Sequence, residues 1–100
     1  MIRIVRDDKQ FEWDENKAAE NYRKHRIRFE RAIEVFDYPL TKYELNRIEK
    51  GEQRWKATGN TKNGMLLVVI HAVRENGIEI TRIISARLAD SEERKDYEHG

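Results

Sequence analysis

Two Asn-Gly dipeptides constrain the fold of this chain more than any other feature. Asn63-Gly64 and Asn76-Gly77 each stand between apolar runs, which is the strongest short-range signal for a β-hairpin. The pattern predicts three antiparallel strands, at about Gln53 to Thr61, Met65 to Arg74 and Ile78 to Arg87. We therefore expect a sheet to fill the second half of the chain.

The first half carries helical patterns. Asp14 is a candidate N-cap for an amphipathic helix that ends near His25, and a second apolar stripe runs from about Phe29 to Asp37, just before Pro39. Short apolar runs at 2–5, 11–13 and 41–45 each fit a strand. Asp90 with Glu93 three residues later fits a capping box that starts a final helix reaching about Tyr97.

These elements predict an α+β fold in which two N-terminal helices pack on an antiparallel β-sheet and a C-terminal helix follows. One hundred residues give room for one modest core, so residues 1–100 are expected to form a single domain. The 20 basic and 19 acidic residues nearly balance, and a net charge of +1 gives no global argument for nucleic-acid binding. Any phosphate site must therefore be local.

Several classes of protein are disfavoured by composition. Cysteine is absent, so disulfides, thiolate catalysis and cysteine-based zinc sites are not expected. The spacing of His25, His71 and His99 matches no metal pattern, and we expect neither a metal nor a cofactor. Without a long apolar segment or the apolar run of a signal peptide, the chain is expected to be cytoplasmic, with no membrane contact.

Strand register predicts where the basic residues lie. If both Asn-Gly pairs form two-residue type I′ turns, Lys56 lies opposite His71 and His71 lies opposite Arg82, with Arg54 on the same face. Trp55 and other apolar residues then face the core. A single β-bulge would move residues beyond it to the other face, and Arg87 is the residue most exposed to that error.

A row of Lys56, His71 and Arg82 is suited to RNA cleavage. Like charges on neighbouring strands destabilise a sheet, and an anionic ligand reverses that effect. Arg54, Lys56 and Arg82 would hold a phosphate and stabilise charge in the transition state, while neutral His71 takes a proton from a ribose 2′-hydroxyl. That chemistry needs no metal. The alternative interpretation is a solvated polar row with no ligand.

Several ordered motifs resemble those of the BrnT toxins. They are Phe11 to Asp14 (FEWD), Lys17 to Asn21 (KAAEN), Lys24-His25, Val35 to Asp37, Glu52 to Trp55 (EQRW), Leu66 to His71 (LLVVIH) and Arg82 to Arg87 (RIISAR). The resemblance implies a RelE/ParE-like fold and an endoribonuclease that inhibits translation. It also implies a ribbon-helix-helix antitoxin as partner, RNA as substrate, and contact with operator DNA only through the antitoxin.

The resemblance also points to individual residues. Arg54, His71, Arg82, Ser85 and Arg87 stand on family motif positions, whereas Lys56 rests on the register. We expect His71, Arg82, Arg54 and Lys56 to be catalytic. Arg87, Ser85 and Arg26 are expected to contact RNA or its phosphates.

The chain departs from the family pattern at three positions. Arg26 and Arg28 stand where the family usually has glycine and a small polar residue, and Leu88 replaces a usual basic residue. The last change removes a phosphate contact, so it bears on catalytic strength.

Two other functions remain open. In the first, the chain has lost cleavage and serves as a binding module that acts with its antitoxin in operator repression. Alternatively, it is a toxin for another target, as ParE-like relatives act on gyrase. In that case, changing His71 to Ala would leave toxicity intact.

Overall fold

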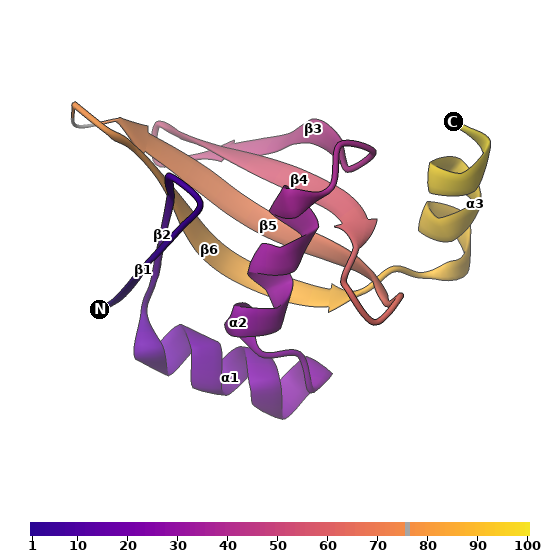
Figure 1. The fold of residues 1–100 in the computed structure, drawn as a ribbon, viewed down its shortest axis with the longest axis horizontal. Coiled ribbons are helices and arrows are strands. Elements are labelled where there is room, and N and C mark those ends of the chain that lie inside the picture. Colours follow the sequence, from indigo (N-terminus) through magenta and orange to yellow (C-terminus); the bar gives the residue numbers. More distant parts are fainter. Residues whose placement is uncertain (76) are drawn as a thin grey trace.

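The computed structural model describes residues 1–75 and 77–100 (Figure 1). Two strands open the chain and a helical segment follows them. Four further strands and a last helix complete it. The strands are β1 (Ile2–Arg6), β2 (Lys9–Trp13), β3 (Lys42–Glu49), β4 (Glu52–Asn60), β5 (Leu66–Glu75) and β6 (Glu79–Leu88). The helices are α1 (Glu15–His25), α2 (Phe29–Ala32), the 3₁₀ helix η1 (Ile33–Asp37) and α3 (Ser91–His99).

The strands form one mixed sheet in the order β1-β2-β6-β5-β4-β3. The predicted pairing of β4, β5 and β6 as antiparallel neighbours is confirmed. The predicted fold class, two N-terminal helices packed on an antiparallel sheet, is wrong. Strand β2 runs parallel to β6, with Gln10 opposite Ile80 and Glu12 opposite Arg82, and two strands precede the helices. A parallel pair needs a long crossover, which local sequence patterns do not reveal. The RelE/ParE-like label likewise finds no support.

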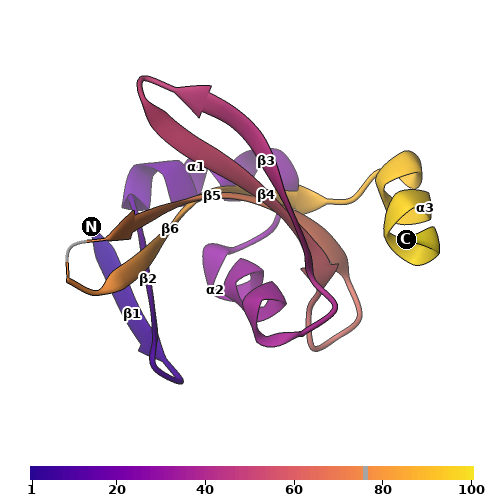
Figure 2. The same ribbon diagram turned by 90° about the horizontal axis from the view of Figure 1, so that it is seen from above.

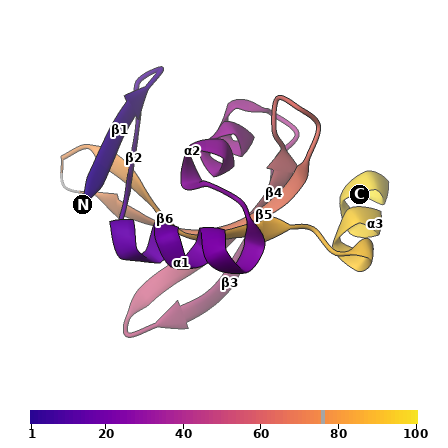
Figure 3. The same cartoon turned by 90° about the horizontal axis from the view of Figure 1, so that it is seen from below.

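Helix α1 begins as its sequence predicts. The Asp14 carboxylate accepts hydrogen bonds from the backbone N–H groups of Asn16, at 2.7 Å, and Lys17, at 3.2 Å, which satisfies donors that the helix leaves free. The helix ends at Arg26, which has a left-handed backbone (φ 59°). Helix α1 packs against β6 and lies in front of the sheet in the view from below of Figure 3.

The second predicted helix, 29–37, has the right extent but is α-helical only in α2. Its second half, η1, is a 3₁₀ helix, and Pro39 explains why its last turn is not α-helical. In an α-helix the carbonyl of Val35 would accept from residue 39, and proline has no N–H. Instead this carbonyl accepts from the Tyr38 N–H at 3.4 Å and from the Thr41 hydroxyl at 2.5 Å.

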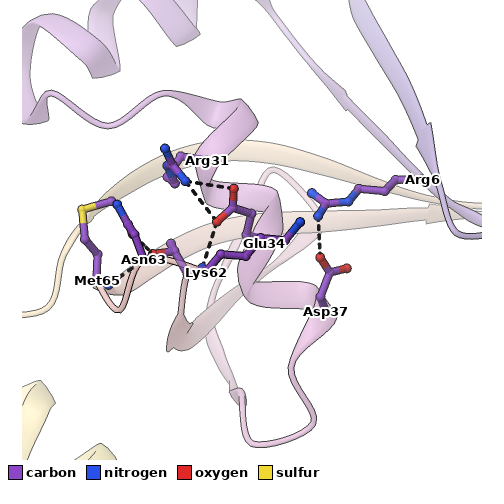
Figure 4. A network of polar contacts seen from close by, with 8 residues as sticks. Arg6, Arg31, Glu34, Asp37, Lys62, Asn63 and Met65 are labelled. Atoms are coloured by element: carbon purple, nitrogen blue, oxygen red, sulfur yellow. Dashed lines mark hydrogen bonds and ion pairs between the residues drawn. The ribbon is translucent and has the colours of Figure 1, made fainter.

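Helices α2 and η1 lie inside the curve of the sheet and cover its concave face (Figure 2). Phe29, Ala32, Ile33 and Val35 are buried there against strand residues such as Ala57, Leu67, Val69 and Ile83. Polar contacts fix the helical segment from both sides (Figure 4). Glu34 accepts from the Lys62 N–H at 3.0 Å, and Asp37 pairs with Arg6 of β1 at 2.8 Å.

The predicted turns are only partly right. The hairpin at Asn63-Gly64 exists, but its connection is longer than two residues. The Thr61 N–H donates to the Met65 carbonyl, and the Gly64 N–H donates to the Thr61 carbonyl. Gly64 has a left-handed backbone conformation. The second predicted turn includes Asn76, which lies outside the described residues. In the described chain, two-residue connections with positive φ occur at Asp7-Asp8 and Lys50-Gly51.

The longer connections change the register, so the predicted Lys56, His71, Arg82 row is wrong. Lys56 lies opposite Ile70, and Trp55 lies opposite His71. On the other side, His71 pairs with Ile83, and Arg82 pairs with Ala72. A shift of one residue moves every side chain of a strand to the other face. A further irregularity between Ile70 and His71 shifts the register again towards the C-terminal end of β6.

Candidate functional site

The face of the sheet opposite α2 and η1 carries a cluster of cations. Ala57 and Trp55 point to the helices, so their neighbours in β4, Arg54 and Lys56, point to this second face. Lys56, Ile70 and Ser85 form one cross-strand row of this face. Arg82 and Arg87 of β6 lie on the same face. Their cross-strand partners in β5, Ala72 and Val68, point to the same side as Ile70, whereas His71 and Val69 point to the helices. We call Arg54, Lys56, Arg82 and Arg87 the cationic cluster.

Glu52 joins two members of the cationic cluster. Its Oε1 atom accepts from the Arg54 Nε at 3.3 Å and also accepts a short hydrogen bond from Arg82. Arg54 additionally pairs with Glu49 of β3 at 3.3 Å. The side chains of Arg82 and Glu52 keep about a third of their surface exposed, so this group is open to a ligand from solvent.

Glu93 of α3 holds the other two members. Arg87 donates to both of its carboxylate oxygens, at 2.7 and 2.9 Å, and Lys56 pairs with it at 2.9 Å. These contacts, with the Arg87 hydrogen bond foremost, hold the pKa of Glu93 far below its usual value. Asp90 and Glu93 also form the predicted capping box, which is confirmed. No residue of α3 is buried, and these ion pairs join the helix to β4 and β6. The helix stands at one end of the sheet (Figure 1).

A third carboxylate, Glu12 of β2, is almost fully buried at the edge of this face. Arg3 donates to its Oε1 atom at 3.1 Å and Arg74 donates at 2.8 Å. Burial raises the pKa of Glu12, but the two arginine contacts outweigh it and hold the pKa below the ordinary value. Glu12 therefore stays ionised and anchors β1 and β5 to β2.

His71 lies on the opposite face from the cationic cluster. Its ring is only 4% exposed and packs edge-on against Phe36, at 5.0 Å between centroids, and against Tyr43, at 6.1 Å. Burial lowers the pKa of His71 to about 4, although the Val69 backbone opposes the shift. The ring is therefore neutral at pH 7. Its Nδ1 atom is buried and has no hydrogen-bond partner.

A cavity of about 370 Å³ opens beside His71. Phe11, Phe36, Tyr43 and Trp55 give it an aromatic lining. Its polar lining comes from the β1–β2 turn and the facing ends of β2 and β6: Asp8, Lys9, Gln10, Glu79 and Thr81. The cavity thus combines aromatic surface with a neutral histidine ring.

Ser85 and Arg26, which the sequence predicts to contact RNA, lie outside the cationic cluster. Ser85 lies on the cationic face and also lines a second cavity, between α1 and β6, together with Lys17, Lys24 and His25. Arg26 lies at the C-terminal end of α1, where its guanidinium is 5.4 Å from the centre of the Tyr22 ring and Arg28 is 4.3 Å from it. This arrangement gives Arg26 a local packing role.

The carboxylates of the site were missed by the analysis of the sequence. Glu52 belongs to the EQRW motif and lies two residues before Arg54, so both point to one face of a strand. That spacing is a usable signal. Glu93 was recognised only as a helix cap, and nothing local indicates that it reaches Arg87 and Lys56.

The described residues contain no group of three or more acidic, histidine or cysteine side chains placed to hold a metal ion. No helix in the described part of the chain is both long enough and apolar enough to span a membrane.

Comparison with known proteins identifies the family. Residues 13–93 match the model of the ribonuclease toxin BrnT of type II toxin-antitoxin systems. The chain belongs to the BrnT family. None of the curated proteins matches it at a significant level.

A solved structure is similar to the chain. The crystal structure of the Brucella abortus ribonuclease toxin BrnT, at 1.1 Å resolution, is 29% identical, with a TM-score of 0.60 over 79% of this chain and 94% of the Brucella chain. BrnT proteins are ribonuclease toxins, and a type II system pairs its toxin with an antitoxin. The predicted family resemblance is therefore confirmed, and RNA cleavage is supported for the family.

Proposed function

We propose that this chain is a metal-independent endoribonuclease whose reaction takes place on the cationic face of the sheet and inhibits translation. The observation that carries the proposal is the contact of Glu52 with both Arg54 and Arg82, on a face with two further cations. Paired guanidinium groups match the geometry of a phosphate. Membership of a ribonuclease toxin family makes an RNA phosphodiester the substrate to consider.

In the proposed reaction the scissile phosphate replaces Glu52 as the partner of Arg54 and Arg82. The Glu52 carboxylate then accepts the proton of the ribose 2′-hydroxyl, and the 2′ oxygen attacks the phosphorus. The two arginines stabilise the added negative charge. The bond to the 5′ oxygen breaks, which leaves a 2′,3′-cyclic phosphate and a 5′-hydroxyl.

Lys56 is the proposed donor to the leaving 5′ oxygen. It is the one member of the cationic cluster that can release a proton, because arginine stays charged at any physiological pH. Arg87 and Ser85 would contact flanking phosphates from β6. His71 has no place in this scheme, since it faces the helices.

The test is cleavage of naked RNA by the purified protein in the presence of EDTA. We expect wild type to cut and to leave cyclic phosphate ends, and Glu52→Gln and Arg82→Ala to lose activity by roughly 10²- to 10³-fold. Arg31→Ala is the matched control, because Arg31 is a partly exposed arginine of α2, on the other side of the sheet, and pairs with Glu34. Activity that survives in both site variants would contradict the assignment.

His71→Ala belongs in the same assay. Its activity distinguishes a reaction on the cationic face from the histidine mechanism that the sequence predicts. Loss of cleavage in this variant alone would favour the histidine mechanism. Addition of the protein to a cell-free translation mixture tests the inhibition of translation directly.

The proposed partner is a ribbon-helix-helix antitoxin, a type that only the family resemblance supplies. In this scheme the toxin reaches operator DNA through the antitoxin alone. Gel filtration with light scattering of the co-expressed pair tests the complex, and detection of only free monomer would contradict it.

A binding module without catalysis is the second candidate. Every member of the cationic cluster is already in an ion pair with a carboxylate. Such pairs are also expected on a sheet surface whose charges only stabilise the fold. If wild type cuts neither naked RNA nor RNA in translating ribosomes, this second function is favoured.

A further inference from the structure

The cavity beside His71 plays no part in the proposed reaction. It lies on the concave side of the sheet, and the cationic cluster lies on the other. Arg54 and Trp55 are consecutive residues of β4, so the two sites are separated by the thickness of the sheet.

We propose that this cavity is a binding pocket for one unpaired nucleobase of the RNA substrate, at a position other than the scissile nucleotide. The inference deepens the proposed function and rests on RNA being the substrate. Tyr43 and Trp55 would stack on the base, and the His71 Nε2 atom would hydrogen-bond to its edge.

The shape and lining fit a planar heterocycle. A volume of about 370 Å³ falls at the lower end of the range of roughly 300–1,000 Å³ for small-ligand sites. Tyr43 is 49% exposed, so part of its ring is available at the mouth of the cavity. Aromatic side chains with exposed faces are the usual stacking surfaces for unpaired bases.

His71 supplies the polar contact that such a pocket requires. Its Nδ1 atom is buried away from the cavity, so the nitrogen that a base would meet is Nε2. Because burial keeps the ring neutral, Nε2 acts as a donor or an acceptor according to the tautomer, and the edge of a base offers both kinds of partner. Packing of the ring against Phe36 and Tyr43 fixes its orientation.

The charges around the cavity favour the base over the phosphate. Asp8 and Glu79 line it together with a single cation, Lys9. The Lys9 ammonium already donates to the Phe36 carbonyl at 2.6 Å. An anion would meet two carboxylates there, whereas an uncharged ring would not be repelled.

The experiment titrates the full chain with the four nucleoside 5′-monophosphates and with ribose 5-phosphate, which has no base. Trp55 fluorescence and the NMR signals of the His71 ring report on the pocket, while Trp13 is 2% exposed in the core and serves as an internal reference. We expect at least one nucleotide to shift both signals and ribose 5-phosphate to shift neither. Equal shifts with ribose 5-phosphate, or no shifts at all, would overturn the proposal.

Variants locate the binding. Tyr43→Ala should weaken nucleotide binding by roughly 5- to 150-fold, the effect of losing one stacking surface. His71→Phe keeps an aromatic ring and removes the hydrogen bond, so it should also weaken binding. Ile48→Ala is the matched control, since Ile48 lies further along β3, is 63% exposed and does not line the cavity. Equal loss in Ile48→Ala would overturn the assignment.

Mapping of RNA cleavage sites separates this proposal from the function on which it rests. Tyr43→Ala should still cut RNA but at altered positions. Suppose that Tyr43→Ala cuts RNA at unchanged positions and that wild type binds no nucleotide. These results would refute the pocket and leave the ribonuclease proposal intact. Nucleotide binding without any cleavage would refute the ribonuclease and leave the pocket. If Tyr43→Ala weakens only antitoxin binding, the pocket holds a protein side chain and the proposal fails.

Discussion

Asn21 of α1 binds the backbone of Ala86 in β6, 65 residues further along the chain. Its amide nitrogen donates to the Ala86 carbonyl at 2.8 Å, and its side-chain oxygen accepts from the Ala86 N–H at 3.0 Å. The same nitrogen donates to the Ile27 carbonyl at 3.0 Å. The side chain thus acts as a short substitute for a neighbouring strand and closes the free edge of β6.

The first prediction concerns this contact. Asn21→Ala leaves three backbone groups without partners in a buried place, so it should lower the free energy of unfolding by about 2–4 kcal/mol. Urea denaturation measures the change. Asn16→Ala, at an exposed position of the same helix, should change stability by less than about 0.5 kcal/mol. Similar losses in both variants would contradict the proposed importance of the strand edge.

The second prediction is a pH dependence of stability that comes from His71. Its pKa is about 4 in the folded chain and about 6.5 when unfolded, so the unfolded state binds more protons between these values. Stability should therefore be complete above about pH 6.5 and fall as the pH drops towards 4, by roughly 3 kcal/mol in all.

His71→Phe should flatten the stability curve between pH 7 and 5, measured by urea denaturation at each pH. Glu12 and Glu93 have lowered pKa values, so their contribution is present above about pH 4.5 and is lost only at lower pH. An unchanged slope in His71→Phe would show that the histidine does not titrate as its burial requires.

The third prediction concerns Glu93 as a competitor of RNA phosphates. Glu93→Gln removes the charge that holds Lys56 and Arg87 but keeps a side chain able to complete the capping box with Asp90. Single-stranded RNA should bind several-fold more tightly, and the dependence of log K on log salt should steepen, because two further cations meet phosphates.

Fluorescence anisotropy at several salt concentrations measures this effect. Glu98→Gln, in the last turn of the same helix, removes an equal charge from an exposed position and should have a smaller effect. Equal effects of the two substitutions would mean that net charge, and not release of the two cations, governs binding.

The fourth prediction concerns Arg26, which has φ of 59° at the end of α1. A left-handed residue there favours glycine, so Arg26→Gly should raise the free energy of unfolding by roughly 0.5–1 kcal/mol. Arg28 would keep its place over the Tyr22 ring. Arg23→Gly, inside the helix, should lower stability by about 1 kcal/mol. Thermal unfolding compares the two, and destabilisation by both would contradict the conformational argument.

Local chemistry determined much of the secondary structure. The Asp14 cap, the Asp90–Glu93 capping box and the positions of β4, β5 and β6 all follow from short patterns, because caps, alternation and turn residues act over a few positions. The BrnT resemblance was also readable, since its motifs are contiguous. Arg54 and Lys56 share a face for the same reason, because they are two residues apart on one strand. Arg82 and Arg87 are five residues apart and share that face because of the irregularity between Ile70 and His71.

Tertiary structure decided which residues face each other across neighbouring strands. One residue added to a hairpin connection shifts a register, and this moved His71 from the predicted row to the aromatic cavity beneath η1. The parallel pairing of β2 with β6, and the reach of Glu93 to Lys56 and Arg87, join residues far apart in the chain. The sequence by itself determined the elements and the family, because these depend on neighbouring residues. Only the folded chain decided the faces and the partners, because these depend on exact connection lengths and on contacts across the sheet.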